Sequence, residues 1–108
     1  MKSIYFTSSL FLFSMLASAQ IVNVSNATEL QNALNAATPG QTIQLASGVY
    51  NKSGGFTINA GVNGSAQNPI TVKGNKNTII SSNSTASGNG IWLKGNSYWI
   101  LDGFTVYK

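Results

Sequence analysis

The sequence contains no cysteine, no histidine and no arginine, and Glu29 and Asp102 are its only acidic residues. The absence of cysteine excludes the disulfides that hold many small secreted domains together, so backbone hydrogen bonds and packed apolar side chains must do this work. The basic residues are all lysines, and they are scattered rather than clustered. A nucleic-acid footprint gathers its charges on one face, so the sequence does not indicate nucleic-acid binding. The mild net charge of +4 is compatible with an anionic partner.

The first part of the chain, residues 1–19, has the pattern of a secretory signal peptide. Lys2 supplies a positive charge, residues 4–16 are mostly apolar, and Ala17-Ser18-Ala19 provides the small residues of a cleavage site. A membrane-spanning helix needs about 20 apolar residues, whereas residues 4–16 form a shorter stretch that polar residues interrupt. We therefore expect a secreted, extracellular mature chain that starts near Gln20 and has no membrane partner.

Residues 20–41 predict a short strand followed by an amphipathic helix at residues 26–37. Asn26 can cap the helix, and Glu29 stands three residues later, which is the spacing of a capping box. Pro39-Gly40 ends the helix. The apolar residues that share one helical face are Leu30, Ala33, Leu34 and Ala37.

After Gly40 the apolar residues occur in short segments instead of at helical spacing. These segments are rich in β-branched and aromatic residues and are separated by Gly, Asn and Ser, as in strands joined by tight turns. They read TIQLA, FTIN, ITVKG, TIIS, IWLKG, WIL and FTVY. Side chains alternate along a strand, so Ile70 and Val72 should face inward, with Thr71 and Lys73 outward. The Asp102-Gly103 pair predicts a corner between the last two strands.

One phrase occurs twice, as ITVKGNKNTII at residues 70–80 and as IWLKGNSYWIL at residues 91–101. The two copies are offset by 21 residues, and a period of about 21 residues, built from short strands and Asn/Gly turns, is typical of a solenoid whose equivalent strands stack in parallel sheets. Stacked asparagines at equivalent corners can form an amide ladder. On this interpretation the stacked pairs are Ile70 and Ile91, Val72 and Leu93, Lys73 and Lys94, and Asn75 and Asn96.

Three other folds explain part of this pattern. A leucine-rich repeat has a similar length, but its leucine and asparagine spacing is missing. An antiparallel sandwich explains strands and turns, but not an in-register Lys-Gly-Asn repeat. An ice-binding coil would need a regular row of threonines, whereas Thr71 aligns with Trp92. The pattern favours an all-β parallel β-helix with a short capping α-helix.

Parts of the sequence also resemble a known group of proteins, namely ELQNALNAATPGQTIQLASGVY, NPITVKG and GNGIWLKGNSYWILDGFTVYK. They resemble the opening of secreted right-handed parallel β-helix proteins of the pectin-lyase-like kind. Within that group, the sequence is most similar to polysaccharide lyases of the chondroitinase B and alginate lyase type and of the pectate lyase L type. The resemblance spans residues 22–108, and its motifs are fold motifs. It implies that residues 20–41 cap a right-handed β-helix and that residues 42–108 form its first coils.

This resemblance implies an incomplete solenoid, open at the C-terminal end. An open last coil exposes strand edges and apolar side chains, which invite association. We expect that end to meet the remaining coils of a longer protein or to associate with itself.

The resemblance further implies a chemistry whose parts this segment lacks. Such lyases abstract the proton beside a uronate carboxyl group, with a lysine base and with Ca²⁺ or cationic side chains that stabilise the developing charge. Ca²⁺ takes about six to eight oxygen ligands, and Glu29 and Asp102 cannot supply them. No residue here matches the catalytic motif, so we expect no catalytic residue, no bound metal and no cofactor in this segment, and Ca²⁺ only in a full-length relative.

Weak candidates for binding an acidic polysaccharide remain. Lys73 and Lys94 should lie on the outer face of neighbouring coils, where a polyuronate would relieve their repulsion, although two lysines that splay into solvent explain the same pattern. Trp92 alternates outward and could stack on a sugar ring, although one such aromatic residue more often serves local packing. Trp99 flanks Ile100, which should face inward. Glycosylation sequons stand at Asn23, Asn26, Asn51, Asn63 and Asn83.

Three functions follow from these observations. The first is the cap and first coils of a secreted polysaccharide lyase that acts on pectate, alginate or a glycosaminoglycan. The second is a non-catalytic module that binds glycans or the cell wall. The third is a structural β-helix that assembles through its open end.

Overall fold

The computed structural model describes residues 20–82 and 90–107. Its elements are β1 (Ile21–Val24), α1 (Ala27–Asn35), β2 (Thr42–Leu45), β3 (Gly48–Asn51), β4 (Phe56–Ile58), β5 (Ile70–Lys73), β6 (Thr78–Ser81), β7 (Ile91–Leu93), β8 (Trp99–Asp102) and β9 (Thr105–Tyr107). Each predicted strand is present, and β3 is an additional strand that we did not predict. The predicted signal peptide lies outside the described residues.

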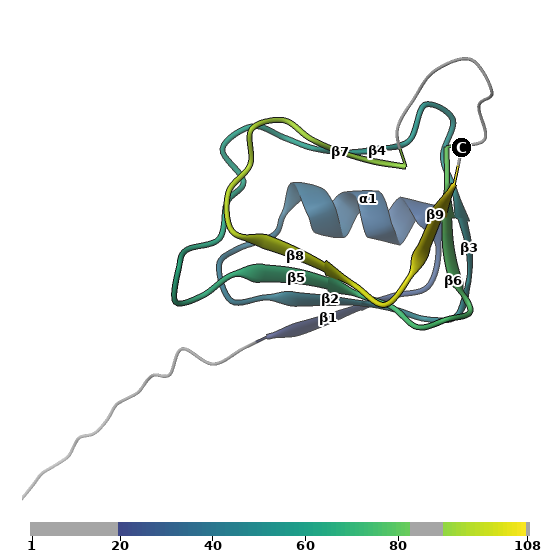
Figure 1. The fold of residues 1–108 in the computed structure, drawn as a ribbon, viewed down its shortest axis with the longest axis horizontal. Helices are drawn as coiled ribbons and strands as arrows, with labels where there is room; N and C mark the ends of the chain where they lie inside the picture. The colour runs from purple at the N-terminus through teal and green to yellow at the C-terminus, as the bar shows by residue number, and fades with distance from the viewer. Residues whose placement is uncertain (1–19, 83–89, 108) are drawn as a thin grey trace, which may run out of the picture.

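The strands form three sheets, with the orders β1-β2-β5-β8, β3-β6-β9 and β4-β7. All the strand pairs are parallel. From β2 onward the chain visits the three sheets in the same order each time, and in Figure 1 the sheets form three sides around α1. The prediction of an all-β fold with one helix is confirmed.

The repeated phrase did not predict the register of the strands. β5 pairs with β8, which places Ile70 beside Trp99, and β7 pairs with β4, which places Ile91 beside Phe56. The prediction that Ile70 stacks on Ile91 was therefore wrong. The phrase repeats because β5 and β7 both end at a Lys-Gly-Asn corner, although they belong to different sheets.

The repeat in the sequence is shorter than one circuit of the chain. In the sheet β1-β2-β5-β8, Thr42 pairs with Thr71 and Thr71 pairs with Ile100, so each circuit from β2 onward adds the same number of residues on this sheet. The sequence repeat instead runs from Ile70 on β5 to Ile91 on β7, which is the distance from one sheet to another. It therefore does not correspond to a complete circuit.

The two corner asparagines act separately, so the predicted amide ladder is also wrong. Asn75 Oδ1 accepts a hydrogen bond from the backbone N–H of Asn77 at 2.8 Å. Asn96 Oδ1 accepts one from the backbone N–H of Lys94 at 2.7 Å, and its Nδ2 donates to the carbonyl of Val62 at 2.8 Å. Each side chain bonds to the backbone of its own corner and also to the preceding circuit, and the two do not bond to each other.

The helix α1 begins as its sequence predicts. Asn26 is the N-cap, and its side chain accepts a hydrogen bond from the backbone N–H of Glu29 at 2.8 Å. The Glu29 carboxylate bonds in return to the backbone N–H of Ser25 at 2.8 Å, one residue earlier than in a standard capping box. Leu30 and Leu34 are completely buried, so this helix closes one end of the core.

Gln31 attaches α1 to the free edge of β4. Its Nε2 donates to the carbonyl of Thr57 at 2.9 Å, and its Oε1 accepts from the backbone N–H of Thr57 at 3.3 Å. The side-chain amide therefore pairs with Thr57 as the backbone of another strand would. This pairing satisfies a strand edge that would otherwise be exposed.

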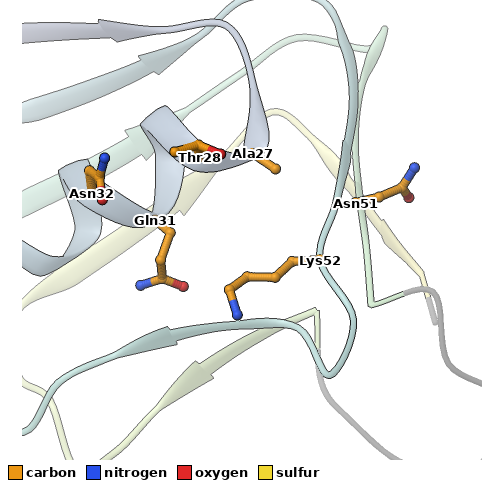
Figure 2. A pocket seen from close by; sticks show the side chains of 6 residues that line it. All are labelled: Ala27, Thr28, Gln31, Asn32, Asn51 and Lys52. Carbon is orange, nitrogen blue, oxygen red and sulfur yellow. The ribbon is translucent and has the colours of Figure 1, made fainter.

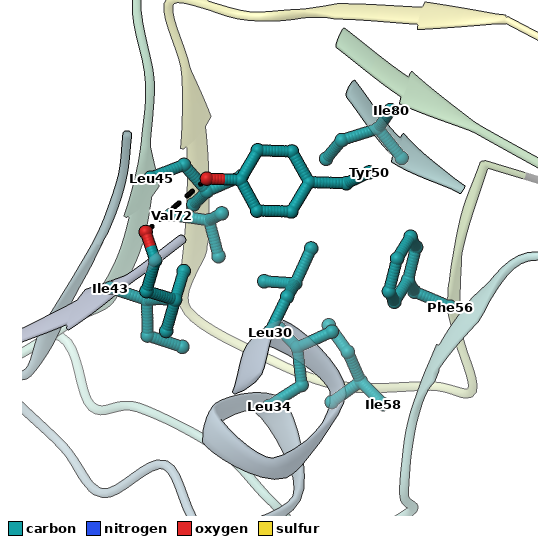
Figure 3. Packing of buried hydrophobic residues seen from close by; sticks show 10 residues of the cluster. Leu30, Leu34, Ile43, Leu45, Tyr50, Phe56, Ile58, Val72 and Ile80 are labelled. Carbon is teal, nitrogen blue, oxygen red and sulfur yellow. Dashed lines mark hydrogen bonds between the residues drawn. The ribbon is translucent and has the colours of Figure 1, made fainter. Parts of the chain in front are cut away.

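The core fills the space between the sheets and the helix (Figure 3). The Tyr50 hydroxyl donates to the carbonyls of Ala46 at 2.7 Å and Val24 at 3.2 Å, and burial raises the pKa of this hydroxyl above its ordinary value of 10.0. The buried cluster consists of Val24, Leu30, Leu34, Ile43, Leu45, Tyr50, Phe56, Ile58, Val72 and Ile80.

The strands β7, β8 and β9 are the last in their sheets, and their side chains are less covered. Leu93 and Leu101 stack beside the buried Ile58 and Val72, yet they are 37% and 43% exposed. Val106 stacks in the same way on β6 and is 46% exposed.

The inward and outward positions of β8 differ from our expectation. Ile100 was expected to face inward, but it pairs with the outward Thr71 and is 47% exposed. Trp99 instead packs against the core. Asp102 ends β8, and Gly103 turns the chain towards β9 with φ of +83°.

Candidate functional site

A row of polar side chains crosses the outer face of the sheet β1-β2-β5-β8. Its members are in register on successive strands, namely Asn23, Gln44, Lys73 and Asp102. Parallel strands lie about 4.8 Å apart, so the row spans about 14 Å. Gln44 Nε2 donates to the carbonyl of Lys73 at 3.2 Å, which holds the amide along the row. The predicted outward position of Lys73 is confirmed, because this side chain is exposed between the buried Val72 and the following corner.

A hollow of about 380 Å³ lies at the β1 end of this polar row. Glu29 is its only charged residue, and the carboxylate accepts hydrogen bonds from both the backbone N–H and the hydroxyl of Ser25. The hollow is lined by Asn23, Val24, Ser25, Glu29, Gln44 and Ala46. Because its one charge is negative, this hollow does not suit the carboxylate of a uronate.

Lys94 lies on a different sheet from Lys73. Lys94 follows β7 in the sheet β4-β7, whereas Lys73 ends β5 in the sheet β1-β2-β5-β8. The prediction that the two lysines face each other on neighbouring coils was therefore wrong. The two copies of the phrase lie on different sheets, so equivalent residues of the two copies, including these lysines, lie on different faces of the molecule.

Lys94 instead forms a pair with Trp92. The Lys94 Nζ lies 5.1 Å from the centroid of the Trp92 ring, within the range of a cation–π contact. Trp92 points outward from β7, as predicted, and is 50% exposed. The ammonium group therefore lies over the face of an exposed aromatic ring, on the outer side of the sheet β4-β7.

The corner after β7 holds the backbone that carries Lys94. Asn96 bonds to the backbone N–H of Lys94 and to the carbonyls of Asn59 and Val62. The indole N–H of Trp99 donates to the same Val62 carbonyl at 2.9 Å. Neither of these bonds of Asn96 and Trp99 was predicted from the sequence. The available signal was Asn96 directly after a glycine at the end of a strand, where an Asn side chain often bonds to the backbone of a turn.

The sequons lie in different environments. Asn23 and Asn51 are exposed on β1 and β3, and the exposed Asn26 caps α1. Asn63 is partly buried, and its Oδ1 accepts a hydrogen bond from the backbone N–H of Ser97 at 2.9 Å. Asn83 lies outside the described residues.

A second hollow, of about 320 Å³, lies between α1 and the end of β3 (Figure 2). Lys52 is its only charged residue, and its other polar groups are a hydroxyl and side-chain amides. It is lined by Ala27, Thr28, Gln31, Asn32, Asn51 and Lys52. The one charged residue that lines this hollow is basic, whereas the one that lines the first hollow is acidic.

The calcium ion that the resemblance implies does not fit the residues of this segment. Within residues 20–82 and 90–107, no three His, Cys, Asp or Glu residues gather into a metal-binding group. Glu29 lines the hollow at the β1 end of the polar row, whereas Asp102 is the member of that row on β8, at the opposite end. No helix in the described part of the chain is long and apolar enough to cross a membrane.

The family model of chondroitinase B matches residues 24–108. The match covers most of the sequence, so the chain belongs to the chondroitinase B family. The predicted resemblance to polysaccharide lyases is thereby confirmed. A search of curated proteins found no match.

Three solved structures are similar to this one. An alginate lyase from Paenibacillus sp. has a TM-score of 0.71 and 28% identity over 82% of this chain. A variant of the PL6-family alginate lyase AlyGC has a TM-score of 0.60 and 22% identity over 82% of this chain. A PL6-family polysaccharide lyase from Pseudopedobacter saltans has a TM-score of 0.56 and 24% identity over 80% of it. The likeness to the last two shows the fold alone. This chain corresponds to 32%, 11% and 18% of the three structures, respectively.

Proposed function

We propose that this chain forms the N-terminal cap and first coils of a secreted, right-handed parallel β-helix polysaccharide lyase. Membership of the chondroitinase B family and the recurring order of the three parallel sheets support this proposal. Residues 20–41 are the cap, residues 42–108 are the first coils, and residues 1–19 are the signal peptide. The partner of the last coil is the rest of the β-helix.

The proposed substrate is an acidic polysaccharide, that is, pectate, alginate or a glycosaminoglycan. The observation that carries this assignment is the exposed Trp92 ring with the Lys94 ammonium over it. On binding, the lysine side chain leaves the ring face, where the sugar then stacks, and pairs with the sugar carboxylate. A uronate unit presents an apolar C–H face that can stack on an aromatic ring, and a carboxylate that can pair with an ammonium group. Lys73 provides a separate cationic contact on the outer face of the sheet β1-β2-β5-β8.

The segment binds in this proposal but does not catalyse. Proton abstraction beside a carboxyl group requires groups that stabilise the resulting negative charge. Glu29 is occupied at the helix start, and Asp102 ends β8 at a corner, so neither provides a metal site. We expect the residues of the reaction to lie on coils outside this segment, with Ca²⁺ among them.

Binding to soluble polyuronates tests the proposal. Trp92→Ala and Lys94→Gln should each weaken binding of alginate or polygalacturonate by about tenfold, since each removes one contact of roughly 1–2 kcal/mol. Lys73→Gln should weaken it less, because that lysine has no aromatic partner. Lys76→Gln, in the exposed turn after β5, is the matched control. Titration calorimetry at low ionic strength gives the affinities, and unchanged affinity in both Trp92→Ala and Lys94→Gln would rule this surface out.

A reaction assay with the same polyuronates separates an enzyme from a non-catalytic module. β-Elimination leaves an unsaturated uronate that absorbs in the ultraviolet. A longer form of the protein that contains further coils is incubated with the polyuronate. An ultraviolet absorbance that rises with time supports the lyase. Binding by such a protein without any new absorbance supports the module.

Self-association is a second candidate function, favoured by the partial exposure of Leu93, Leu101 and Val106. These side chains lie on three sheets at the same end of the solenoid, together with the free edges of their strands. Sedimentation velocity should then show particle size rising with protein concentration. Leu101→Lys should suppress the rise, and a monomer at every concentration would exclude assembly.

A further inference from the structure

The hollow beside the cap helix has walls that its neighbours hold in place. Gln31 Nε2 donates to Asn35 Oδ1 and to the carbonyl of Thr57, both at 2.9 Å, so this side-chain amide cannot turn freely. The Lys52 backbone is fixed on both sides, because its N–H donates to the carbonyl of Ser81 and its carbonyl accepts from Gly55. The hollow is therefore largely formed before any ligand arrives.

The chemistry of the lining selects for a hydroxylated anion. In Figure 2 the Lys52 side chain extends towards the side-chain amide of Gln31. Thr28 and Asn32 line the helix side with a hydroxyl and an amide, and no acidic residue lines this hollow. An ammonium group pairs well with a carboxylate, whereas hydroxyl and amide groups exchange hydrogen bonds with the hydroxyls of a sugar.

The size of the hollow limits the ligand. Its volume of about 320 Å³ lies at the small end of the range for ligand sites. A phosphate dianion is most often held by arginine or by several cations, and this chain has no arginine. A single lysine matches the single charge of one carboxylate.

We propose that this hollow binds one or two uronate units of an acidic saccharide, with Lys52 on the carboxylate and Thr28 and Asn32 on the hydroxyls. The class of sugar rests on the proposed function, but the site is separate from Trp92, Lys94 and Lys73. It lies at the cap end, beside α1, and Trp92, Lys94 and Lys73 are not among the residues that line it. The cap is therefore a second saccharide contact as well as a closure of the core.

Titration of the ¹⁵N-labelled protein with a mannuronate disaccharide tests this inference. The backbone amides of Thr28, Asn32 and Lys52 should shift and saturate together. Lys52→Gln should weaken this binding by at least about tenfold, because it removes a charge-assisted hydrogen bond. Asn32→Asp should also weaken it, because it places a second carboxylate beside the first. Lys76→Gln should leave it unchanged, and circular dichroism of each variant checks the fold.

Two simpler ligands separate charge from sugar. Acetate at the same concentration should shift these amides far less than the disaccharide, and so should glucose. Equal shifts with acetate would reduce the site to a nonspecific anion contact and overturn the inference. Equal shifts with glucose would show that binding does not need a carboxylate, and hence not Lys52, and would also overturn the inference.

The outcome is distinguishable from that of the proposed function. If Lys94→Gln abolishes the amide shifts that the disaccharide induces and Lys52→Gln does not, the sugar binds at Trp92. The cap site is then refuted, while the proposed function stands. If Lys52→Gln alone abolishes them, the cap site stands whatever happens to polymer binding at Trp92.

Discussion

The two ends of the stacked strands are built from the same kinds of residue but are covered very differently. At the cap end, Leu30 and Leu34 of α1 lie over the core and are completely buried. At the other end, the inward residues Leu93, Leu101 and Val106 keep 37–46% of their surface exposed. Each layer of such a stack is covered only by its neighbours, so the protection of the core depends on what closes each end.

The strand edges show the same contrast. At the cap end, the Gln31 amide takes both backbone groups of Thr57 and so closes the edge of β4. At the other end, β7, β8 and β9 each have a strand on one side only within the described residues. The contrast holds for the sheet β4-β7, where Gln31 pairs with the edge of β4 and nothing in the described residues pairs with the edge of β7; β1 and β3 are also the first strands of their sheets.

The largest difference should appear on truncating a leucine at each end. Leu34→Ala should lower the free energy of unfolding by about 3 kcal/mol, since it leaves a cavity in a closed part of the core. Leu101→Ala should lower it by less than about 1 kcal/mol, since much of that side chain is already in water. Urea unfolding followed by circular dichroism measures both values. Equal losses would mean that the two ends are equally covered in solution, for instance by self-association.

Two glycine corners differ in how closely the preceding circuit approaches them. A Cβ at Gly103 would lie 2.6 Å from the carbonyl oxygen of Gly74 on the preceding corner, at a φ of +83°. Gly103→Ala should therefore cost about 3 kcal/mol, from backbone strain and the clash together. Gly95 also has a positive φ, but among the described residues a Cβ there would meet nothing within 4 Å. Gly95→Ala should cost only about 1 kcal/mol.

Thermal unfolding of the two glycine variants under identical conditions provides this test. A Gly95→Ala variant as unstable as Gly103→Ala would show that strain in φ, and not the close approach of successive corners, decides the cost.

The smallest effect is expected in the interior, away from both ends. The Ser82 hydroxyl is buried and has no hydrogen-bond partner among the described residues. Ser82→Ala should leave stability unchanged or raise it by up to about 1 kcal/mol, because it removes the cost of burying an unpaired polar group. The melting temperature measures this change. A clear loss of stability would mean that the hydroxyl is paired in solution, for example by a buried water.

The sequence was sufficient to predict several features whose cause is local, although it did not reveal β3 or the facing of β8. Asn26 and Glu29 marked the start of α1, and the alternation in ITVK correctly assigned Val72 to the inside and Lys73 to the outside. The Asp102-Gly103 corner was also predictable, since this pair favours a tight turn.

The register could not be predicted from the sequence, because it depends on loop lengths. Three strands make one circuit, and the connections between them vary in length, so the repeated phrase alone does not reveal which strands are neighbours. The contact between Lys94 and Trp92 follows from the local alternation, but their separation from Lys73 follows only from the register. The hollows also escaped prediction, since each joins the helix to strands that follow it in the chain.

The order of the strands within each sheet also bears on how the chain acquires its structure. From β5 onward every new strand is laid beside the one formed a circuit earlier, on the side away from α1. A nucleus at the helix can therefore grow by successive addition, in the direction in which a ribosome delivers the chain. The amino-terminal helix is then the template on which the first circuit condenses, and each finished circuit becomes the template for the next.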